Sequence, residues 1–359
     1  FHVSDKSWYG GVFSDPPHPA IPSELLHHHG DGDNDDVFND NVGYMQNPNV
    51  YNNTIVFCSE GDVYLTSIPE RTTATGTGTD SSKRALPAMR LTSTVGNVNT
   101  PTINPKYPYL IAFTATYTGH REVYLMDLRS NHRSRPSMRL TYMDSEYGVL
   151  SVVGWEDEGT TLVVSTFNME VALEDQRLYK IGVVQKHFNN TKTNGDNQHG
   201  RLVGTTESPI TVSSVKAVPL SQAIDSTFDE DSKCRYFTRF KQSSNTIRYV
   251  GGTAESLWAY CDGQDVAVPL TQDYVGTSKS PQIYTTKAGT KYLFFLSDRA
   301  NVDGNGWMPA TMNLWAAPLP KVCKSPATDK MARPVKLTSI SCIDGMSLQE
   351  FAIDTANSN

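Results

Sequence analysis

The chain has 359 residues, of which 38% are hydrophobic, 10% aromatic and 19% charged, and its formal net charge is −7. This composition suffices for a large buried core. The acidic balance argues against a nucleic-acid partner, which requires a basic surface. The sequence has no apolar run of about 18 residues, which argues against a membrane-spanning helix. It starts at Phe1 without a signal-peptide pattern, so we expect that any leader was removed or that the sequence starts internally.

Residues 1–42 differ from the rest of the chain. They contain four prolines and then a His- and Asp-rich run at 27–36, which predicts an extended N-terminal arm. Imidazoles and carboxylates are potential metal ligands. However, a calcium-binding loop needs Gly and Glu where this run has Asp36 and Val42. We therefore interpret the arm as a solvated acidic segment, and we predict no metal site and no cofactor.

From residue 43 onward the sequence predicts β-strands. Short runs rich in Val, Ile, Tyr, Phe and Trp are bounded by Gly, Pro, Asn and Asp. Helical periodicity is almost absent, and its best candidate, 167–177, is short and polar. The predicted strands recur in units and lie at 53–58, 62–66, 110–114, 123–128, 152–155, 161–165, 177–181, 235–239, 246–250, 256–260, 291–296 and 313–317.

A short phrase of the type Arg-Leu-Thr recurs once in each unit. Its leucines are Leu91, Leu140, Leu202, Leu270 and Leu337. They lie about 50 to 70 residues apart, a period typical of propellers and solenoids.

We predict an all-β fold: a β-propeller of the six-bladed type with the sixth blade incomplete. A β-solenoid is the alternative, but it has shorter units and needs no long insertions. The sequence has such insertions at 70–88, 184–200, 221–233 and 300–312. The propeller is expected to span 43–359, with blades near 43–69, 90–128, 139–183, 201–261 and 268–319, and with the start of a sixth at 335–359.

The five cysteines allow few disulfides. Cys58 ends an apolar strand and is expected to be a buried thiol. Cys234 and Cys261 fall on predicted parallel strands with one strand between them, beyond the roughly 7 Å Cα limit of a bridge. Cys323 and Cys342 are the one pair for which we expect a disulfide, provided that the protein is secreted.

Two Asn-x-Thr sequons, at Asn52 and Asn189, lie in predicted turns or loops where glycans are accepted. Together with the processed N-terminus, they slightly favour a secreted or extracytoplasmic location, with a cytoplasmic one as the alternative. Sequons also occur by chance in a chain of this length.

No pattern of catalytic residues is visible. The sequence has no Gly-x-Ser-x-Gly, no His-Glu-x-x-His, no Cys-x-x-Cys and no phosphate-binding loop. His120, His132, His187 and His199 fall in predicted loops without a paired serine or carboxylate, and we interpret them as surface histidines. We predict no catalytic residue, so residues 1–359 alone should leave peptide substrates and a fluorophosphonate serine probe unreacted.

Several phrases carry a resemblance. Phe294–Arg299 followed by Asn313-Leu-Trp315, Arg248–Thr253 followed by Leu257-Trp258, and Gln46–Pro48 resemble the N-terminal six-bladed propeller of the tricorn protease family. The resemblance spans about 43–345. The Arg-Leu-Thr phrase is also similar to that of TolB-like propellers.

The resemblance implies that this chain is the non-catalytic propeller of a large, oligomeric serine peptidase of the C-terminal-processing class. It would act in the passage and docking of peptide substrates or products, and the catalytic Ser and His would lie in later domains. The alternative is a stand-alone TolB-like or secreted propeller that binds a protein or glycan. The expected partners are peptides and further copies of the chain in a homo-oligomer.

An incomplete sixth blade would expose unpaired strand edges. We therefore expect later residues of the same polypeptide, or a partner chain, to complete it. Residues 348–353 are predicted to be its inner strand.

Overall fold

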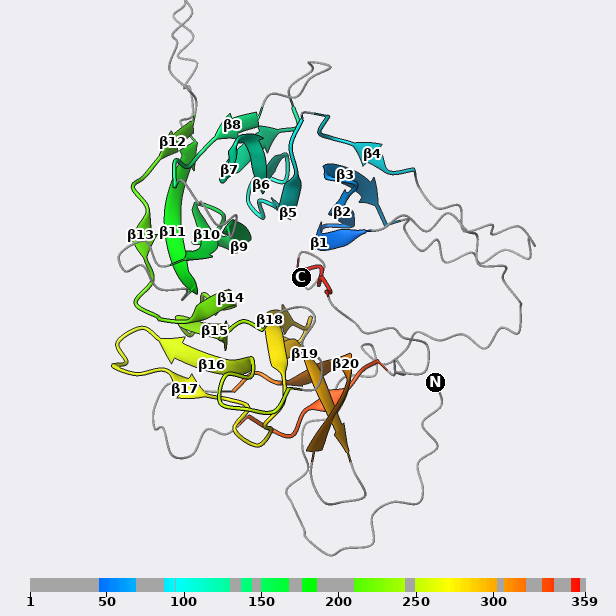
Figure 1. Ribbon diagram of the computed structural model, residues 1–359, viewed down its shortest axis with the longest axis vertical. Helices are drawn as coiled ribbons and strands as arrows, with labels where there is room; N and C mark the ends of the chain where they lie inside the picture. The colour runs from blue at the N-terminus through cyan, green and yellow to red at the C-terminus, as the bar shows by residue number, and fades with distance from the viewer. Residues whose placement is uncertain are drawn as a thin grey trace, which may run out of the picture.

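The computed structural model describes residues 45–68, 87–93, 95–129, 137–143, 150–167, 176–185, 210–242, 249–301, 307–320, 331–338 and 350–355. Among these residues there are 21 strands and no helix, hence no helix able to cross a membrane. The strands form five antiparallel sheets around a central axis (Figure 1), which makes the described fold a five-bladed β-propeller.

Each sheet is a blade whose strands follow one another in chain order from the axis outward, except that in blade 3 both β12 and β13 pair with β11. Blade 1 consists of β1 (Gln46–Tyr51), β2 (Thr54–Ser59), β3 (Asp62–Ser67) and β4 (Met89–Arg90). Blade 2 consists of β5 (Val98–Ile103), β6 (Leu110–Thr118), β7 (His120–Asp127) and β8 (Ser137–Arg139). Blade 3 consists of β9 (Leu150–Glu156), β10 (Thr161–Phe167), β11 (Gln176–Gln185), β12 (Ile210–Val212) and β13 (Lys216–Ala217). Blade 4 consists of β14 (Ala223–Asp229), β15 (Cys234–Arg239), β16 (Ser256–Cys261) and β17 (Val268–Pro269). Blade 5 consists of β18 (Ser278–Thr285), β19 (Lys291–Asn301), β20 (Trp307–Pro318) and β21 (Val335–Lys336).

The prediction of six blades is wrong for the described chain. The recurring phrase forms the short outer strand that closes a blade, whereas the prediction made it the start of the next one. Val335 and Lys336 pair with Ala316 and Trp315 and thereby complete blade 5. The phrase expected to begin a sixth blade is therefore the end of the fifth.

The phrase around Leu202 lies outside the described residues. In blade 3 the outer position is taken by β13, after which the N–H of Val218 donates to the carbonyl of Leu178. Blade 4 begins with β14, at a place where the sequence predicted an insertion. The strand predicted at 246–250 falls partly outside the described residues, and β15 and β16 pair directly with each other, so no strand lies between them in the sheet. Blade 4 thus spans 223–269 instead of 201–261.

The threonine of the recurring phrase forms hydrogen bonds to the third strand of its blade. In blade 2, Thr141 Oγ1 accepts a hydrogen bond from the N–H of Val123 at 2.9 Å and donates to the Glu122 carboxylate. Arg139 Nη2 donates to the same carboxylate at 2.8 Å. Equivalent threonines in blades 1, 4 and 5 accept from backbone N–H groups of the third strands, and they are Thr92, Thr271 and Thr338. The hydroxyl of the phrase therefore stabilises the pairing of the outer strand with the third strand of the blade.

Thr141→Val should lower the free energy of unfolding by about 1–3 kcal/mol, because a buried N–H and a buried carboxylate each lose a partner. Thr141 and Glu122 are 2% and 0% exposed, so water cannot replace the hydroxyl. Thr141→Ser keeps the hydroxyl and should retain most of the stability. Urea unfolding of both variants tests this expectation, and equal stability of the valine and serine variants would contradict it.

The hydrophobic core lies between neighbouring blades. Separate clusters of buried side chains join blades 1 and 2, 2 and 3, 3 and 4, and 4 and 5. At the remaining junction, a cluster of blade 5 packs against Phe351 and Ile353. In the view of Figure 1, residues 350–355 lie in red near the axis, between β1 and β18. The ring is therefore bridged between blades 5 and 1 by this segment.

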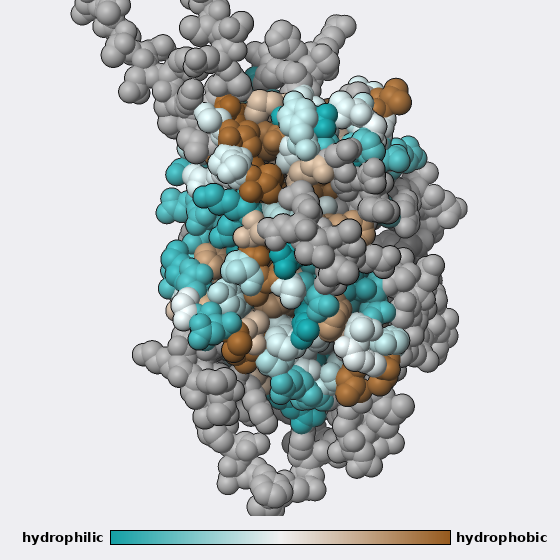
Figure 2. Space-filling view, turned by 60° about the vertical axis from the view of Figure 1, so that its left-hand side comes forward, coloured by the Kyte–Doolittle hydropathy of each residue, from teal (hydrophilic) through white to brown (hydrophobic). Residues whose placement is uncertain are grey.

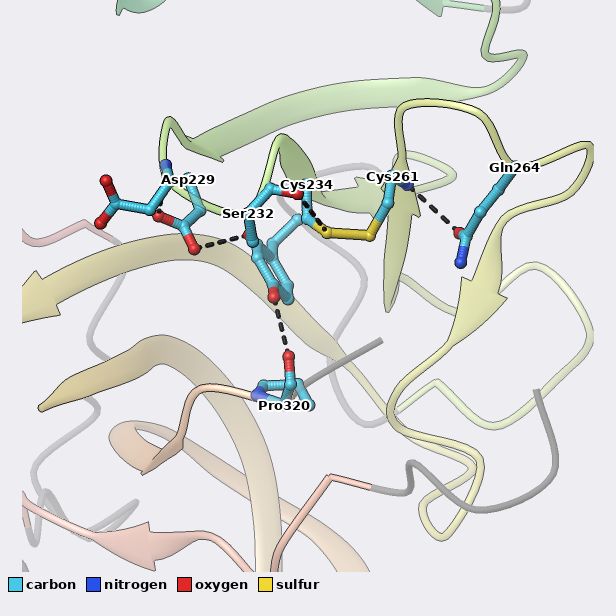
Figure 3. Close-up of a disulfide and its surroundings, with 8 residues drawn as sticks. Asp229, Ser232, Cys234, Cys261, Gln264 and Pro320 are labelled. Atoms are coloured by element: carbon cyan, nitrogen blue, oxygen red, sulfur yellow. Dashed lines mark hydrogen bonds between the residues drawn. A yellow bond between two sulfur atoms is a disulfide. The ribbon is translucent and has the colours of Figure 1, made fainter. Parts of the chain in front are cut away.

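The structure contradicts the expectation that Cys234 and Cys261 stay apart. Cys234 begins β15, Cys261 ends the adjacent antiparallel β16, and the two residues face each other in register. Their Cα atoms are 3.9 Å apart and their sulfurs form a disulfide, shown as the yellow bond in Figure 3. The prediction failed because it placed a strand between β15 and β16. Cys58 is a buried free thiol, and Cys323 and Cys342 lie outside the described residues.

The outer side of the ring turned forward in Figure 2 carries hydrophobic residues in separate groups among hydrophilic ones. Small exposed apolar groups of this kind are normal for a solvent-facing surface. This surface therefore gives no indication of a binding site, whereas the inner strands and the turns at their ends carry clustered polar groups.

Candidate functional site

The inner strands β1, β5, β9, β14 and β18 surround the axis (Figure 1). In each of them the pairing with the second strand is interrupted by a bulge. Three of the bulges begin with a residue of positive φ that precedes a proline, namely Asn47, Thr100 and Ser280. Proline donates no ladder hydrogen bond and is tolerated at a bulge, so the X-Pro pairs mark the inner strands in the sequence.

The bulges bring polar groups to the junctions between blades. Thr100 Oγ1 in blade 2 accepts from the N–H of Val152 in blade 3 at 2.9 Å. The N–H of Ser280 in blade 5 donates to Thr238 Oγ1 in blade 4 at 3.0 Å. The inner strands are therefore tied to the next blade by polar contacts as well as by the apolar clusters.

A polar pocket of about 240 Å³ opens between blades 1 and 2. It lies where β1 and β5 begin, on the face of the propeller that carries the β2–β3 turn, which we call the upper face. Its lining residues are Gln46, Cys58, Ser59, Glu60, Gly61, Asn97, Val98, Asn99 and Arg121. Three side-chain amides, one guanidinium and one carboxylate therefore meet at the upper end of the inner strands.

Arg121 is the cation of this pocket. With the Asn99 amide oriented so that its oxygen faces Arg121, that oxygen accepts from Nη1 at 3.0 Å, and the amide nitrogen donates to the Val98 carbonyl at 2.7 Å. Burial lowers the pKa of Arg121 below its ordinary value. A guanidinium remains charged even so, and it is held in place within the pocket.

Cys58 lies at the pocket but is no nucleophile. Its side chain is 2% exposed. Burial, with a smaller contribution from the charge of Glu350, raises the pKa of the thiol to about 12. The thiolate is the reactive form of cysteine, so at neutral pH this group behaves as a small apolar side chain.

A second polar group lies at the junction of blades 4 and 5. The Asp225 carboxylate accepts from the N–H of Thr238 at 3.2 Å and from Ser280 Oγ at 3.3 Å. Glu255, nearby, accepts from the N–H of Gln242 at 3.0 Å and lies 3.7 Å from Lys279 Nζ. Burial raises the pKa of both carboxyls, although Lys279 draws each pKa in the opposite direction.

The raised pKa of Asp225 should appear in the pH dependence of stability. A folded-state pKa above the unfolded value of about 3.9 means that stability is lost as the pH rises through this range. Asp225→Asn removes that loss, so the free energy of unfolding of the variant, relative to wild type, should increase as the pH rises from 4 to 8.

Asp127→Asn serves as the control with the opposite sign. The hydrogen bond from Arg129 lowers the pKa of Asp127, so this variant should lose stability relative to wild type as the pH rises towards and above about 3.9. Urea unfolding at several pH values measures both differences. A pH-independent difference for Asp225→Asn would contradict the expectation.

The other predicted site residues are distributed over the fold. Asn52 is exposed in the β1–β2 turn, and its glycosylation stays a prediction. His120 is exposed at the start of β7. Asn189, the N-terminal arm, His132, His187 and His199 lie outside the described residues. Within the described ranges, no three His, Cys, Asp or Glu side chains are placed to hold a metal ion.

The comparisons with known proteins identify a fold and no family. No protein-family model and no curated protein matches the sequence. Among solved structures, a crystal structure of the tricorn protease matches with a TM-score of 0.53 and 16% identity, over 83% of this chain and 23% of that chain. A TolB protein from Agrobacterium tumefaciens matches with a TM-score of 0.47 and 12% identity, over 82% of both chains. The chain thus shares the propeller fold found in the tricorn protease structure, and it spans less than a quarter of the tricorn protease chain.

Proposed function

We propose that this chain is the non-catalytic propeller of a tricorn-like serine peptidase, and that it docks extended polypeptide at the upper end of its inner strands. The observation that carries the proposal is the polar pocket between blades 1 and 2. The resemblance of several phrases to the tricorn family and the fold shared with the tricorn protease support the same assignment.

The residues of the pocket suit the recognition of a peptide backbone. The amides of Gln46, Asn97 and Asn99 each offer donors and an acceptor, which match the C=O and N–H groups of an extended chain. Arg121 adds donors in a fixed planar arrangement. Groups of this kind bind many sequences, since they read the backbone and not particular side chains. Such binding is what a docking or passage site for peptide substrates or products requires.

Binding of an unfolded polypeptide tests the proposal. Fluorescein-labelled, reduced and carboxymethylated lactalbumin should bind the wild-type chain, as measured by fluorescence anisotropy. Arg121→Gln should weaken this binding by about tenfold, which corresponds to about 1.4 kcal/mol. Arg129→Gln is the matched control: it makes the same change in charge in the same blade, at an exposed arginine paired with Asp127. Equal affinities of the two variants, or no binding to wild type, would contradict the proposal.

The second candidate function is a stand-alone secreted propeller that binds a protein or glycan. The Cys234–Cys261 disulfide favours it, because structural disulfides persist mainly in oxidising compartments. This candidate predicts that a glycan or folded-protein ligand binds while unfolded lactalbumin does not. The same anisotropy measurement therefore separates the two functions.

A further inference from the structure

The junction between blades 5 and 1 differs from the other four. There, residues 350–355 lie between the inner strands β18 and β1 (Figure 1). We call residues 350–355 the bridging segment. Its sequence is Glu-Phe-Ala-Ile-Asp-Thr.

Two carboxylates fasten the bridging segment to blade 1. Glu350 accepts a hydrogen bond from the backbone N–H of Asn47 near the start of β1. Asp354 accepts from the N–H of Asn52 at 2.9 Å and of Asn53 at 3.0 Å, in the turn that follows β1. The segment therefore runs in the same direction as β1 along its whole length.

The backbone N–H groups that donate to these carboxylates belong to residues in the left-handed conformation. Asn47, Asn52 and Asn53 have φ values of 50°, 48° and 61°. Backbone N–H groups presented by turns of this kind form concave binding sites for anions. Blade 1 thus offers two carboxylate positions, one at each end of its inner strand.

Blade 5 recognises the backbone of the same segment. The Gln282 amide donates from Nε2 to the Phe351 carbonyl at 2.9 Å and accepts, at Oε1, from the N–H of Ile353 at 3.1 Å. One side-chain amide therefore satisfies two backbone groups of an extended peptide, as a neighbouring strand would do. These contacts do not depend on which side chains the peptide carries.

Apolar contacts lie between the two carboxylates. Phe351 and Ile353 pack against the blade 5 cluster of Tyr292, Phe294 and Ala316. Yet none of the residues 350–355 is fully buried, and none forms a strand ladder. Side-chain contacts and partial burial hold the bridging segment, so another peptide with the same features can take its place.

We propose that the junction between β1 and β18 is a binding site for an extended peptide with acidic residues at its first and fifth positions and apolar residues at its second and fourth. The bridging segment occupies this site within the chain itself. The inference rests on the proposed peptide-docking function. It adds a second site, between blades 5 and 1, which prefers peptides of this sequence pattern. A partner segment of this pattern binds by displacing residues 350–355.

The test uses the full chain and a fluorescein-labelled peptide with the sequence of residues 347–356, and it measures fluorescence anisotropy. In wild type the bridging segment competes at high effective concentration. Glu350→Ala with Asp354→Ala weakens this competitor, so the double variant should bind the peptide at least about tenfold more tightly than wild type does. Adding Gln282→Ala should abolish the gain, because it removes the hydrogen bonds of the Gln282 amide with the peptide backbone.

A peptide with Gln and Asn in place of Glu350 and Asp354 should bind the double variant about tenfold more weakly, since both carboxylate contacts are lost. A double variant that melts cooperatively but binds the two peptides equally, or not at all, overturns the inference. Lactalbumin binding, measured on the same samples, reports on the Arg121 pocket. Its persistence in that case would show that the inference fails while the proposed function stands.

Discussion

Removal of the Cys234–Cys261 disulfide should lower the free energy of unfolding by about 3.5 kcal/mol. The bond joins residues 27 positions apart. Closing a loop of this length lowers the conformational entropy of the unfolded chain, which raises the free energy of the unfolded state by about 3.5 kcal/mol. Cys234→Ala with Cys261→Ala tests the expectation by urea unfolding. The double variant is preferable to a single one, which would leave an unpaired thiol beside an alanine.

Dithiothreitol provides the matched control. In a background that also carries Cys323→Ala and Cys342→Ala, it should lower the stability of the chain with the Cys234–Cys261 bond to about that of the double variant and leave the double variant unchanged, because the remaining thiol, Cys58, does not take part in the bond. Peptide mapping without reductant should recover Cys234 and Cys261 in one linked fragment. Alkylation of both thiols in protein exported to an oxidising compartment would contradict the disulfide.

The sequence predicted the propeller because its strongest features are local. Runs such as Leu110–Thr114 and Thr161–Ser165 combine β-branched and aromatic residues between turn residues, and they lie within strands β6 and β10. The recurring Arg-Leu-Thr phrase is explained by hydrogen bonds within one blade, such as that between Thr141 and Val123. Features of this range can be recognised without knowledge of the tertiary structure.

The inner strand of blade 4 was missed for the opposite reason. Residues 223–229 contain two aspartates and a serine, and five of the seven residues are only partly buried. Conversely, residues 246–250 are rich in β-branched and aromatic residues and therefore predicted a strand, but β15 and β16 pair directly with each other, with no strand between them in the sheet. Because the prediction placed a strand at 246–250 and none at 223–229, it shifted the blade boundary and misplaced Cys234 relative to Cys261.

The number of blades and the candidate sites depend on contacts between distant residues. Closure between blades 5 and 1 depends on hydrogen bonds between Gln282 and residues 350–355, and no local sequence pattern predicts these contacts. The pocket likewise combines Gln46, Asn99 and Arg121 from different strands. One informative pattern was present, however: the X-Pro pairs at Asn47 and Ser280 mark the two inner strands that border the bridging segment.

The buried ion pair between blades 3 and 4 should give the second large effect. Arg235 Nη1 lies 2.5 Å from Glu156 Oε1, and Nη2 donates to Oε2 at 2.8 Å. The two side chains are only 4% and 6% exposed. The Lys180 side chain is 34% exposed, and its Nζ lies 2.9 Å from the same carboxylate.

Arg235→Ala should therefore destabilise the fold by about 3–5 kcal/mol, because it leaves the Glu156 carboxylate buried with only the partly solvated Lys180 as its cationic partner. Arg235→Met with Glu156→Gln removes both charges at similar volume and should recover most of this loss, since a buried ion pair contributes little net stability over apolar packing. Urea unfolding of Arg235→Met, of Glu156→Gln and of the double variant yields the coupling energy between the two residues. A double variant that loses the sum of the two single losses would show that the residues act independently and that Lys180 alone compensates Glu156.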